Sequence, residues 1–377
     1  MKFPIYFDNA ATTAVDPRVV QKMITCLTSE GQFGNPASLS HSVGQAAKAL
    51  VEWSRAEVAS LIGAESSEII WTSGATEADN LALKGAAQLY QRKGKHIVTL
   101  KTEHKAVLDS CEQLEKIGFS VTYLTPEPNG LLNLEKLAQA LRKDTILVSI
   151  MHVNNELGVI QDIEAIAKIT SARDILLHVD AAQSIGKIPI NVANTPIDLL
   201  SMCAHKVHGP KGIGALYVRR KPRVRVAAQI HGGGQEQGMR SGTLATHQIV
   251  GMAEALRIAK EEMTHDYHHL KKIRDRFLAA ISAHDPVVLH GDQATCYPGI
   301  VNLRFSKWTA KEFMQMFPMI AVSSGSACHT KGIEPSYVLR AMGLMVEQAH
   351  QALRFSFSRF TTEEEIDFAV EKIVESL

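Results

Sequence analysis

Several side chains with complementary chemistry follow predicted strands. Asp180 and Gln183 close the buried segment HVDAAQ, and the pair His205-Lys206 comes shortly afterwards. A fixed carboxylate keeps a pyridine nitrogen protonated, and a lysine amine can hold an aldehyde as a Schiff base. Far downstream, Cys328 in SSGSAC adds a sulfur nucleophile. Asp180 or Lys206 alone is more often a turn residue or a solvated charge, but the combination predicts a pyridoxal phosphate site with its own thiol.

Two further positions fit such a site. The segment SGATEADNLALKGAA follows a predicted strand at residues 68–71, and backbone amides at a helix start, with the Thr76 hydroxyl, would hold a phosphate. An ordinary capped helix remains the alternative, because Ser and Thr are common caps. His104 lies between a strand and a helix, where an imidazole could stack on a pyridine ring and move protons near neutral pH. A structural histidine would look the same.

Cys328 is predicted to lie in a loop and Arg354 in a strand. Cys328 stands in VSSGSACHTKG, whose serine and glycine content predicts a mobile, exposed loop, and a nucleophile that carries sulfur needs such mobility. Cys26 and Cys111 are expected to be buried and inert. Arg354 alternates with apolar residues in LRFSFSRF, as in a strand. It could clamp a substrate carboxylate in a bidentate manner, with a structural ion pair as the alternative.

Length and composition bound these interpretations. The 377 residues, 45% of them hydrophobic, predict one large domain and a smaller one. The formal charge of +1 gives no electrostatic reason to expect nucleic acid or a membrane as partner. The five cysteines include no CxxC pair and therefore indicate neither a zinc site nor a disulfide framework. The start MKFPIYFDNAATT does not look like a signal peptide, so we expect a cytoplasmic protein.

Apolar runs alternate with helical patterns through the first two thirds of the chain. Strands are predicted at residues 68–71, 96–100, 145–151, 175–179 and 215–218. This pattern is typical of an α/β fold with a mostly parallel, helix-covered sheet, and polar residues after the strands should converge at their carboxyl ends. From about Ile258 a charged helix leads into a smaller C-terminal α+β domain. The predicted limits are residues 16–258 for the large domain, and 1–15 with 259–377 for the small one.

The whole chain resembles the group I cysteine desulfurases of the IscS/NifS type, which belong to the class V aminotransferase superfamily of fold-type I enzymes. The resemblance rests on DNAATT, FGNPAS, TSGATEADN, KTEHKAVL, MHVNNELG, HVDAAQS, HGGGQEQGMRSGT, SSGSAC and EPSYVLRAMG. It implies a seven-stranded, mostly parallel sheet, the cofactor pyridoxal 5'-phosphate, and conversion of L-cysteine to L-alanine. The sulfur would pass to Cys328 as a persulfide and then to an iron-sulfur scaffold or a tRNA-thiolation carrier.

The resemblance also assigns roles to individual residues. Lys206 would bind the cofactor covalently, while Asp180 pairs with its ring nitrogen, Gln183 with its ring oxygen, and His104 stacks on the ring. The phosphate would be held by Ala75, Thr76 and His205, and by Thr243 of the neighbouring subunit in an obligate homodimer. Asn155 and Arg354 would hold the substrate carboxylate, with Asn155 also near the cofactor.

Some positions depart from the family pattern. Cys203 stands where the family usually has a serine for the cofactor phosphate, and a thiol is the weaker donor. We therefore predict weakened cofactor binding, by about 1 kcal/mol, that Cys203→Ser should restore. Gln237 replaces an arginine, and the chain ends at Leu377 without the extension that docks the scaffold protein in longer members. Alternatives are transamination, selenocysteine cleavage, or a degenerate paralogue that only binds a partner.

Overall fold

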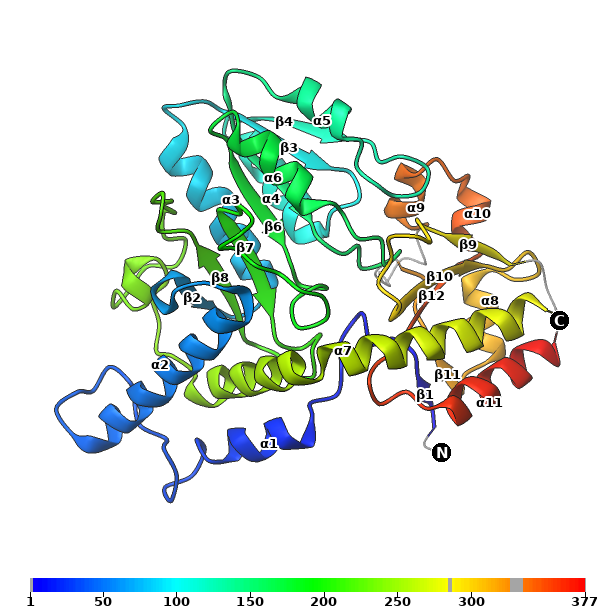
Figure 1. Ribbon diagram of the computed structural model, residues 1–377, viewed down its shortest axis with the longest axis horizontal. Helices are drawn as coiled ribbons and strands as arrows, with labels where there is room; N and C mark the ends of the chain where they lie inside the picture. The colour runs from blue at the N-terminus through cyan, green and yellow to red at the C-terminus, as the bar shows by residue number, and fades with distance from the viewer. Residues whose placement is uncertain (1–2, 284–286, 326–334, 377) are drawn as a thin grey trace.

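A seven-stranded sheet forms the centre of the computed structural model, which describes residues 3–283, 287–325 and 335–376 (Figure 1). Across the sheet the strands are β2 (Ile69–Thr72), β8 (Gly214–Val218), β7 (Leu199–Cys203), β6 (Leu176–Asp180), β5 (Thr145–Met151), β3 (His96–Leu100) and β4 (Ser120–Leu124). Only β8 runs against its two neighbours. The mostly parallel α/β sheet is confirmed, and the carboxyl ends of β2, β3, β5, β6 and β7 share one edge.

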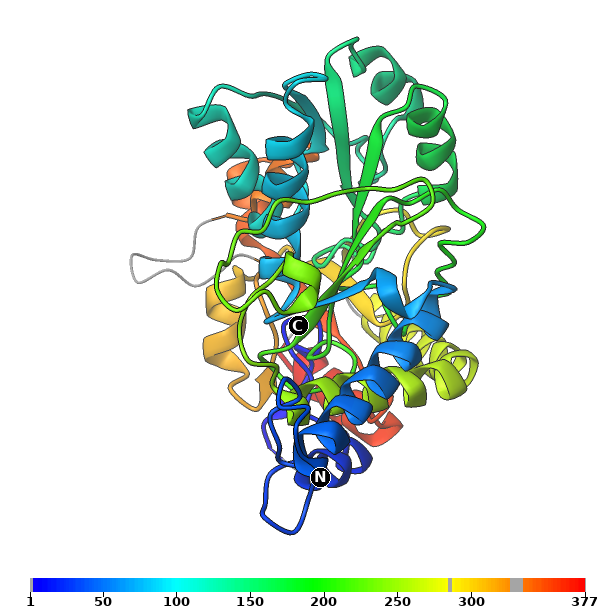
Figure 2. The same ribbon diagram turned by 90° about the vertical axis from the view of Figure 1, so that its left-hand side faces the viewer.

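Helices cover both faces of this sheet because its inner strands are apolar on both sides. The helices of this part are α1 (Pro17–Ile24), α2 (Ser42–Ile62), α3 (Ala75–Tyr90), α4 (Lys105–Lys116), α5 (Leu134–Ala140) and α6 (Ile163–Ser171), with 3-10 turns at Ser66–Glu68 and Glu236–Gly238. Successive strand residues point to opposite faces: Leu147 packs with α3 and α4, and Val148 packs with α2 and α6. Figure 2 shows the sheet between these two helical layers.

A second core is formed by the C-terminal third of the chain together with the first residues. Its antiparallel sheet has the order β12 (Ala352–Ser356), β10 (Ile300–Arg304), β9 (Val288–His290), and β1 (Ile5–Tyr6) pairs in parallel with β11 (Ile320–Ala321). The helices α8 (Ala310–Met316) and α11 (Glu363–Val374) pack in this core, whereas α9 (Tyr337–Ala341) and α10 (Val346–His350) belong to a smaller cluster with Leu157 and Val159. Phe7 packs there edge-on against Phe357, so the chain start joins this core. The predicted domain limits stay a prediction.

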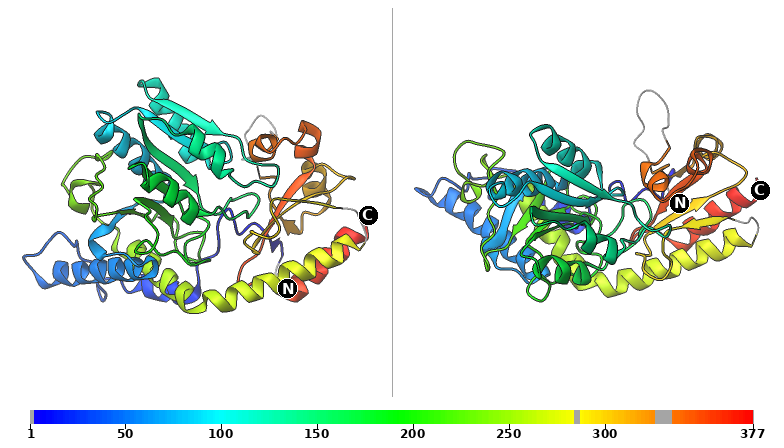
Figure 3. Two further views of the ribbon diagram at one scale, coloured as in Figure 1. Left: turned by 45° about the horizontal axis from the view of Figure 1, so that its top comes forward. Right: turned by 90° about the horizontal axis from the view of Figure 1, so that it is seen from above.

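One long helix, α7 (Thr246–Ser282), serves both cores, as Figure 3 shows. Ile249, Met252 and Leu256 belong to the core around the large sheet, whereas Ile273 and Phe277 belong to the second core. The change to a charged pattern near Ile258 therefore marks a change in what the helix packs against, not the beginning of a helix.

Other classes of feature are absent from the described part of the chain. None of its helices is both long and apolar enough to cross a membrane. No cluster of three or more His, Cys, Asp or Glu side chains is arranged to hold a metal ion within residues 3–283, 287–325 and 335–376. The cysteines in those ranges are free thiols and are buried: Cys26, Cys111, Cys203 and Cys296.

Candidate active site

A cleft of about 730 Å³ opens at the carboxyl edge of the large sheet and reaches Arg354 of β12. We call it the cleft. It is lined by nearly all of the residues predicted from the sequence: Ala75, Thr76, His104, Asn155, Asp180, Gln183, His205, Lys206 and Arg354. Apart from Arg354, they lie at or after the carboxyl ends of β2, β3, β5, β6 and β7, which explains why distant segments meet here.

The start of α3 faces the cleft with free backbone donors. Gly74, which precedes the helix, makes no side-chain cap, and a Cβ added at this glycine would meet no atom within 4 Å. Glu77 in the first turn is held away, because it accepts from the backbone N–H of Ser73 at 2.8 Å and from Arg240 Nε at 2.9 Å. Unpaired N–H groups at a helix start attract an anion such as a phosphate.

His205 lines the same cleft as this helix start. Its Nδ1 is 3.2 Å from the Thr12 hydroxyl, and its backbone oxygen accepts from the Thr13 N–H at 2.8 Å, so the chain start fixes the turn that carries Lys206. Burial, with a contribution from the charge of Lys206, lowers the pKa of His205 to about 4. The imidazole is therefore neutral at pH 7 and contributes a hydrogen bond rather than a charge.

Two carboxyl groups are buried at the floor of the cleft. Asp180 is 4% exposed and accepts from the backbone N–H of Ala182 at 2.8 Å. Asp79, on the inner face of α3, is 1% exposed, and neither of its oxygens has a hydrogen-bond partner within the described residues. Burial raises the pKa of Asp79, and the nearby Asp180 charge raises it further. A buried acidic pair of this kind favours a cationic ligand group, such as a protonated ring nitrogen.

His178 supports the same floor as a neutral residue. Its Nδ1 is 2.8 Å from Ser149 Oγ, and its Nε2 is 2.9 Å from Ser201 Oγ and 3.5 Å from Asp79 Oδ1. Complete burial lowers the pKa of His178 to about 3. The histidine therefore brings no charge to neutralise the acidic pair.

His104 caps helix α4 with its own side chain. Nδ1 accepts from the backbone N–H of Ala106 at 3.1 Å. Burial and the charge of Lys206 lower the pKa of the imidazole, so the neutral form dominates near pH 7. Because Nδ1 is the acceptor, the ring proton of this neutral form is on Nε2. His104 is thus positioned as a donor through Nε2.

Arg354 brings a guanidinium group to the cleft. Arg354 Nη2 pairs with Asp8 at 2.7 Å, Nη1 donates to the Asn155 backbone oxygen at 2.9 Å, and Nε has no partner within the described residues. Both sequence-based readings of Arg354 therefore have support, since the ion pair exists and the guanidinium still lines the cleft. A guanidinium held on one side can bind a carboxylate on the other.

The other predicted residues do not line the cleft in the described structure. Cys203 is completely buried, and its Sγ lies 3.9 Å from the Ala182 backbone oxygen, so its predicted contact with a phosphate stays a prediction. Thr243 borders a separate groove of about 620 Å³ that also contains Pro36 and Arg55. Cys328 lies outside the described residues.

Besides Asp79, further residues of the cleft, such as Glu156, were not predicted from the sequence. Glu156 is 1% exposed and accepts from Ser336 Oγ at 2.5 Å. Burial raises its pKa to about 7, against the opposing effects of the Ser336 hydrogen bond and the Arg354 charge. Gly325, at φ +79°, packs against it so closely that an added Cβ would come within 2.3 Å of Oε2. An acidic residue directly after the predicted Asn155 was the signal that could have found Glu156.

The chain is similar to known proteins along nearly its whole length. It matches the family model described as Aminotransferase class-V over residues 5–368. Cysteine desulfurase IscS of Vibrio atlanticus (strain LGP32) is 58% identical over 373 residues, which are 99% of this chain and 92% of that protein. A solved structure named NIFS-LIKE PROTEIN has a TM-score of 0.92 and 37% identity over 99% of this chain and 98% of its own. Another solved structure, named SspA in complex with cysteine, has a TM-score of 0.84 and 37% identity over 95% of this chain and 99% of its own.

Proposed function

We propose that this chain, which belongs to the class-V aminotransferase family and to its cysteine desulfurases of the IscS/NifS type, removes sulfur from L-cysteine and leaves L-alanine. The cofactor pyridoxal 5'-phosphate would bind in the cleft. The observation that carries the proposal is the convergence of a lysine, a buried acidic pair, a free helix start and an arginine on one cleft. Its volume of about 730 Å³ suits a cofactor together with a small amino acid.

The residues of the cleft fit this cofactor chemically. The free start of α3 and His205 would hold the phosphate, Asp180 would pair with the ring nitrogen, and Gln183 would donate to the ring oxygen. Lys206 supplies the amine that would hold the aldehyde. Asp79 is buried close to Asp180, which raises its pKa, and a protonated ring nitrogen nearby would favour its ionised form.

When bound, pyridoxal phosphate supplies an electron sink for charge that develops on the substrate carbon. Arg354 and Asn155 would orient the substrate through its carboxylate. Lys206 would also act as the base that takes the α-proton of the substrate. His104 holds a proton on Nε2 that it can donate inside the cleft.

Sulfur transfer is assigned to Cys328, which the resemblance singles out. Its thiolate would attack the substrate sulfur, the carbon–sulfur bond would break with its electron pair going to the substrate carbon, and a proton would complete alanine. The persulfide left on Cys328 would then pass to an acceptor protein, such as an iron-sulfur scaffold or a tRNA-thiolation carrier. A cytoplasmic location is part of the same proposal.

We also propose a homodimer in which Thr243 serves the neighbouring site. The groove that contains Thr243 is separate from the cleft of its own chain. A phosphate contact from Thr243 would therefore be made to another subunit, as the resemblance implies.

The test is incubation of the purified protein with pyridoxal phosphate, L-cysteine and a thiol reductant. We expect equal amounts of alanine and sulfide, loss of both products in Cys328→Ala, and loss of the yellow colour of the bound cofactor in Lys206→Ala. Wild-type protein that stays colourless after addition of pyridoxal phosphate contradicts the proposal. Full alanine production by Cys328→Ala would instead favour an activity that needs no thiol.

A further inference from the structure

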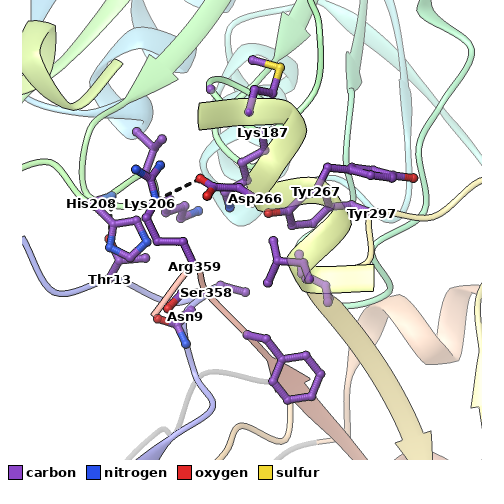
Figure 4. Close-up of a pocket in the computed structure, with 18 residues that line it drawn as sticks. Asn9, Thr13, Lys187, Lys206, His208, Asp266, Tyr267, Tyr297, Ser358 and Arg359 are labelled. Atoms are coloured by element: carbon purple, nitrogen blue, oxygen red, sulfur yellow. Dashed lines mark hydrogen bonds and ion pairs between the residues drawn. The ribbon is translucent and has the colours of Figure 1, made fainter. Parts of the chain in front are cut away.

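Lys187 is a partly buried amine that none of the roles above uses. Its Nζ donates to Gln183 Oε1 at 2.9 Å and lies 5.4 Å from the centre of the Tyr297 ring. Together with Lys206 it lines a cavity of about 30 Å³ behind the cleft (Figure 4). Lys187 itself does not line the cleft, whereas Gln183 and Ala10 do. The amine therefore reaches the cleft only through Gln183.

The contacts of Gln183 fix which end of its amide faces which neighbour. The Ala10 backbone oxygen can only accept, so the amide atom next to it must be Nε2, and the atom next to the Lys187 donor is the carbonyl oxygen Oε1. Nε2 then donates to the Ala10 backbone oxygen at 2.7 Å. An amide nitrogen has two hydrogens, and Ala10 is the single acceptor that Nε2 has within the described residues. The second N–H is left for a ligand in the cleft.

Without Lys187, the Gln183 amide would keep only one of the two hydrogen bonds that hold it in this orientation. The Ala10 contact alone would hold one N–H, while Oε1 would be buried without a donor, which costs free energy. The amide could relieve that cost by turning its oxygen toward the cleft. An oxygen there would repel the ring oxygen that Gln183 is assigned to bind, because both would be acceptors.

We propose that Lys187 is a positioning residue that holds the Gln183 amide with its N–H toward the ring oxygen of the cofactor. This inference rests on the proposed pyridoxal phosphate site. Lys187 acts through Gln183 and touches neither substrate nor cofactor.

The surroundings of Lys187 lower its pKa, so the effect of its hydrogen bond can be tested apart from the effect of its charge. Burial and the charge of Lys206 lower the pKa of Lys187 to about 7. The titratable or charged groups around it are Lys206, Cys203 and Arg354 and, across the cavity, His208, Asp266, Tyr267, Tyr297 and Arg359. The neutral amine can still donate to Gln183, so a neutral donor should replace Lys187 if orientation is what matters.

The experiment compares Lys187→Met, Lys187→Gln, Gln183→Met and the Lys187→Met/Gln183→Met double variant with wild type, each purified and supplied with pyridoxal phosphate. Two quantities are measured: the cofactor dissociation constant, and the pH midpoint of the visible band of the bound cofactor. An N–H donor stabilises negative charge on the ring oxygen. We therefore expect Lys187→Met to raise the midpoint by about one pH unit and to weaken cofactor binding roughly tenfold.

The other variants test the route of the effect. Lys187→Gln should restore most of the wild-type midpoint, and the double variant should match Gln183→Met, because coupled residues are not additive. A wild-type midpoint in Lys187→Met overturns the inference, as does a further shift in the double variant beyond Gln183→Met. Reduced melting temperature of cofactor-free Lys187→Met with an unchanged midpoint also overturns it, because Lys187 would then be merely structural. A wild-type protein with no visible band contradicts the proposed function itself.

Discussion

The Arg55–Glu236 pair should be among the most sensitive points of this fold. Arg55 donates to both Glu236 oxygens, at 2.7 and 2.8 Å, and the same carboxylate accepts from the backbone N–H of Trp71 at 2.8 Å. The side chains are 7% and 2% exposed. The pair ties α2 and β2 to the loop that leads to Thr243. Removal of one member of such a buried pair leaves the other charge uncompensated.

The perturbation is Glu236→Gln, which keeps the volume and the acceptor for Trp71. A glutamine offers one oxygen to Arg55 and places an NH₂ group against the other guanidinium nitrogen. Breaking a buried pair typically costs about 3–5 kcal/mol, and retention of the Trp71 contact favours the lower figure. At roughly 2 °C per kcal/mol, the melting temperature should fall by about 6 °C. Urea unfolding followed by far-ultraviolet circular dichroism measures the same loss.

Glu52 provides the matched control on the same arginine. Its Oε2 lies 3.4 Å from Arg55 Nε, but its side chain is 52% exposed. Glu52→Gln should therefore change the free energy of unfolding by less than about 1 kcal/mol. If Glu236→Gln is as stable as Glu52→Gln, the buried pair does not stabilise the fold as argued.

Three further outcomes follow from the site. Because burial raises the pKa of Glu156 in the folded protein to about 7, its contribution to the free energy of unfolding falls by on the order of 3 kcal/mol as pH rises from about 4.5 to 7. The pH dependence of urea unfolding should therefore flatten in Glu156→Gln, and an unchanged slope would refute this. His104→Asn keeps a helix cap and should melt like wild type, while alanine production falls about 100-fold or more; retained activity would exclude a proton-transfer role for His104. In Gly214→Ala, the new Cβ would lie 2.4 Å from the Met202 backbone oxygen and 2.7 Å from Gly74 Cα. We therefore expect the free energy of unfolding in urea to fall by about 1–3 kcal/mol and cofactor binding to weaken. Wild-type values for both quantities would contradict this expectation.

The sequence predicted the parts of the fold that have strong local signals. The five predicted strands are confirmed within one or two residues. β7 was missed because its residues, LLSMC, include no β-branched side chain. β4 was missed because SVTYL is an edge strand whose side chains are only partly buried, so it lacks a continuous buried run. The full length of α7 was missed because its first half is buried nearly all round and lacks an amphipathic pattern.

In the site, too, some residues could be predicted from local sequence signals and others could not. Residues directly after strands, such as Asp180 and His104, could be predicted because the carboxyl ends of parallel strands meet at one edge. Asp79 and Lys187 could not, since each matters only through a neighbour that the fold supplies: Asp79 lies inside a helix, and Lys187 acts on an amide four residues earlier. Both look like ordinary polar residues until their burial is known.

The continuity of α7 limits how this molecule can move. At 1.5 Å per residue its 37 residues form a rod about 55 Å long, embedded in one core at each half. A hinge between the two cores would have to break backbone hydrogen bonds in the middle of this rod. Entry of substrate and exit of product should therefore depend on small shifts of the segments around the mouth of the cleft, with the two halves of the molecule moving as one body.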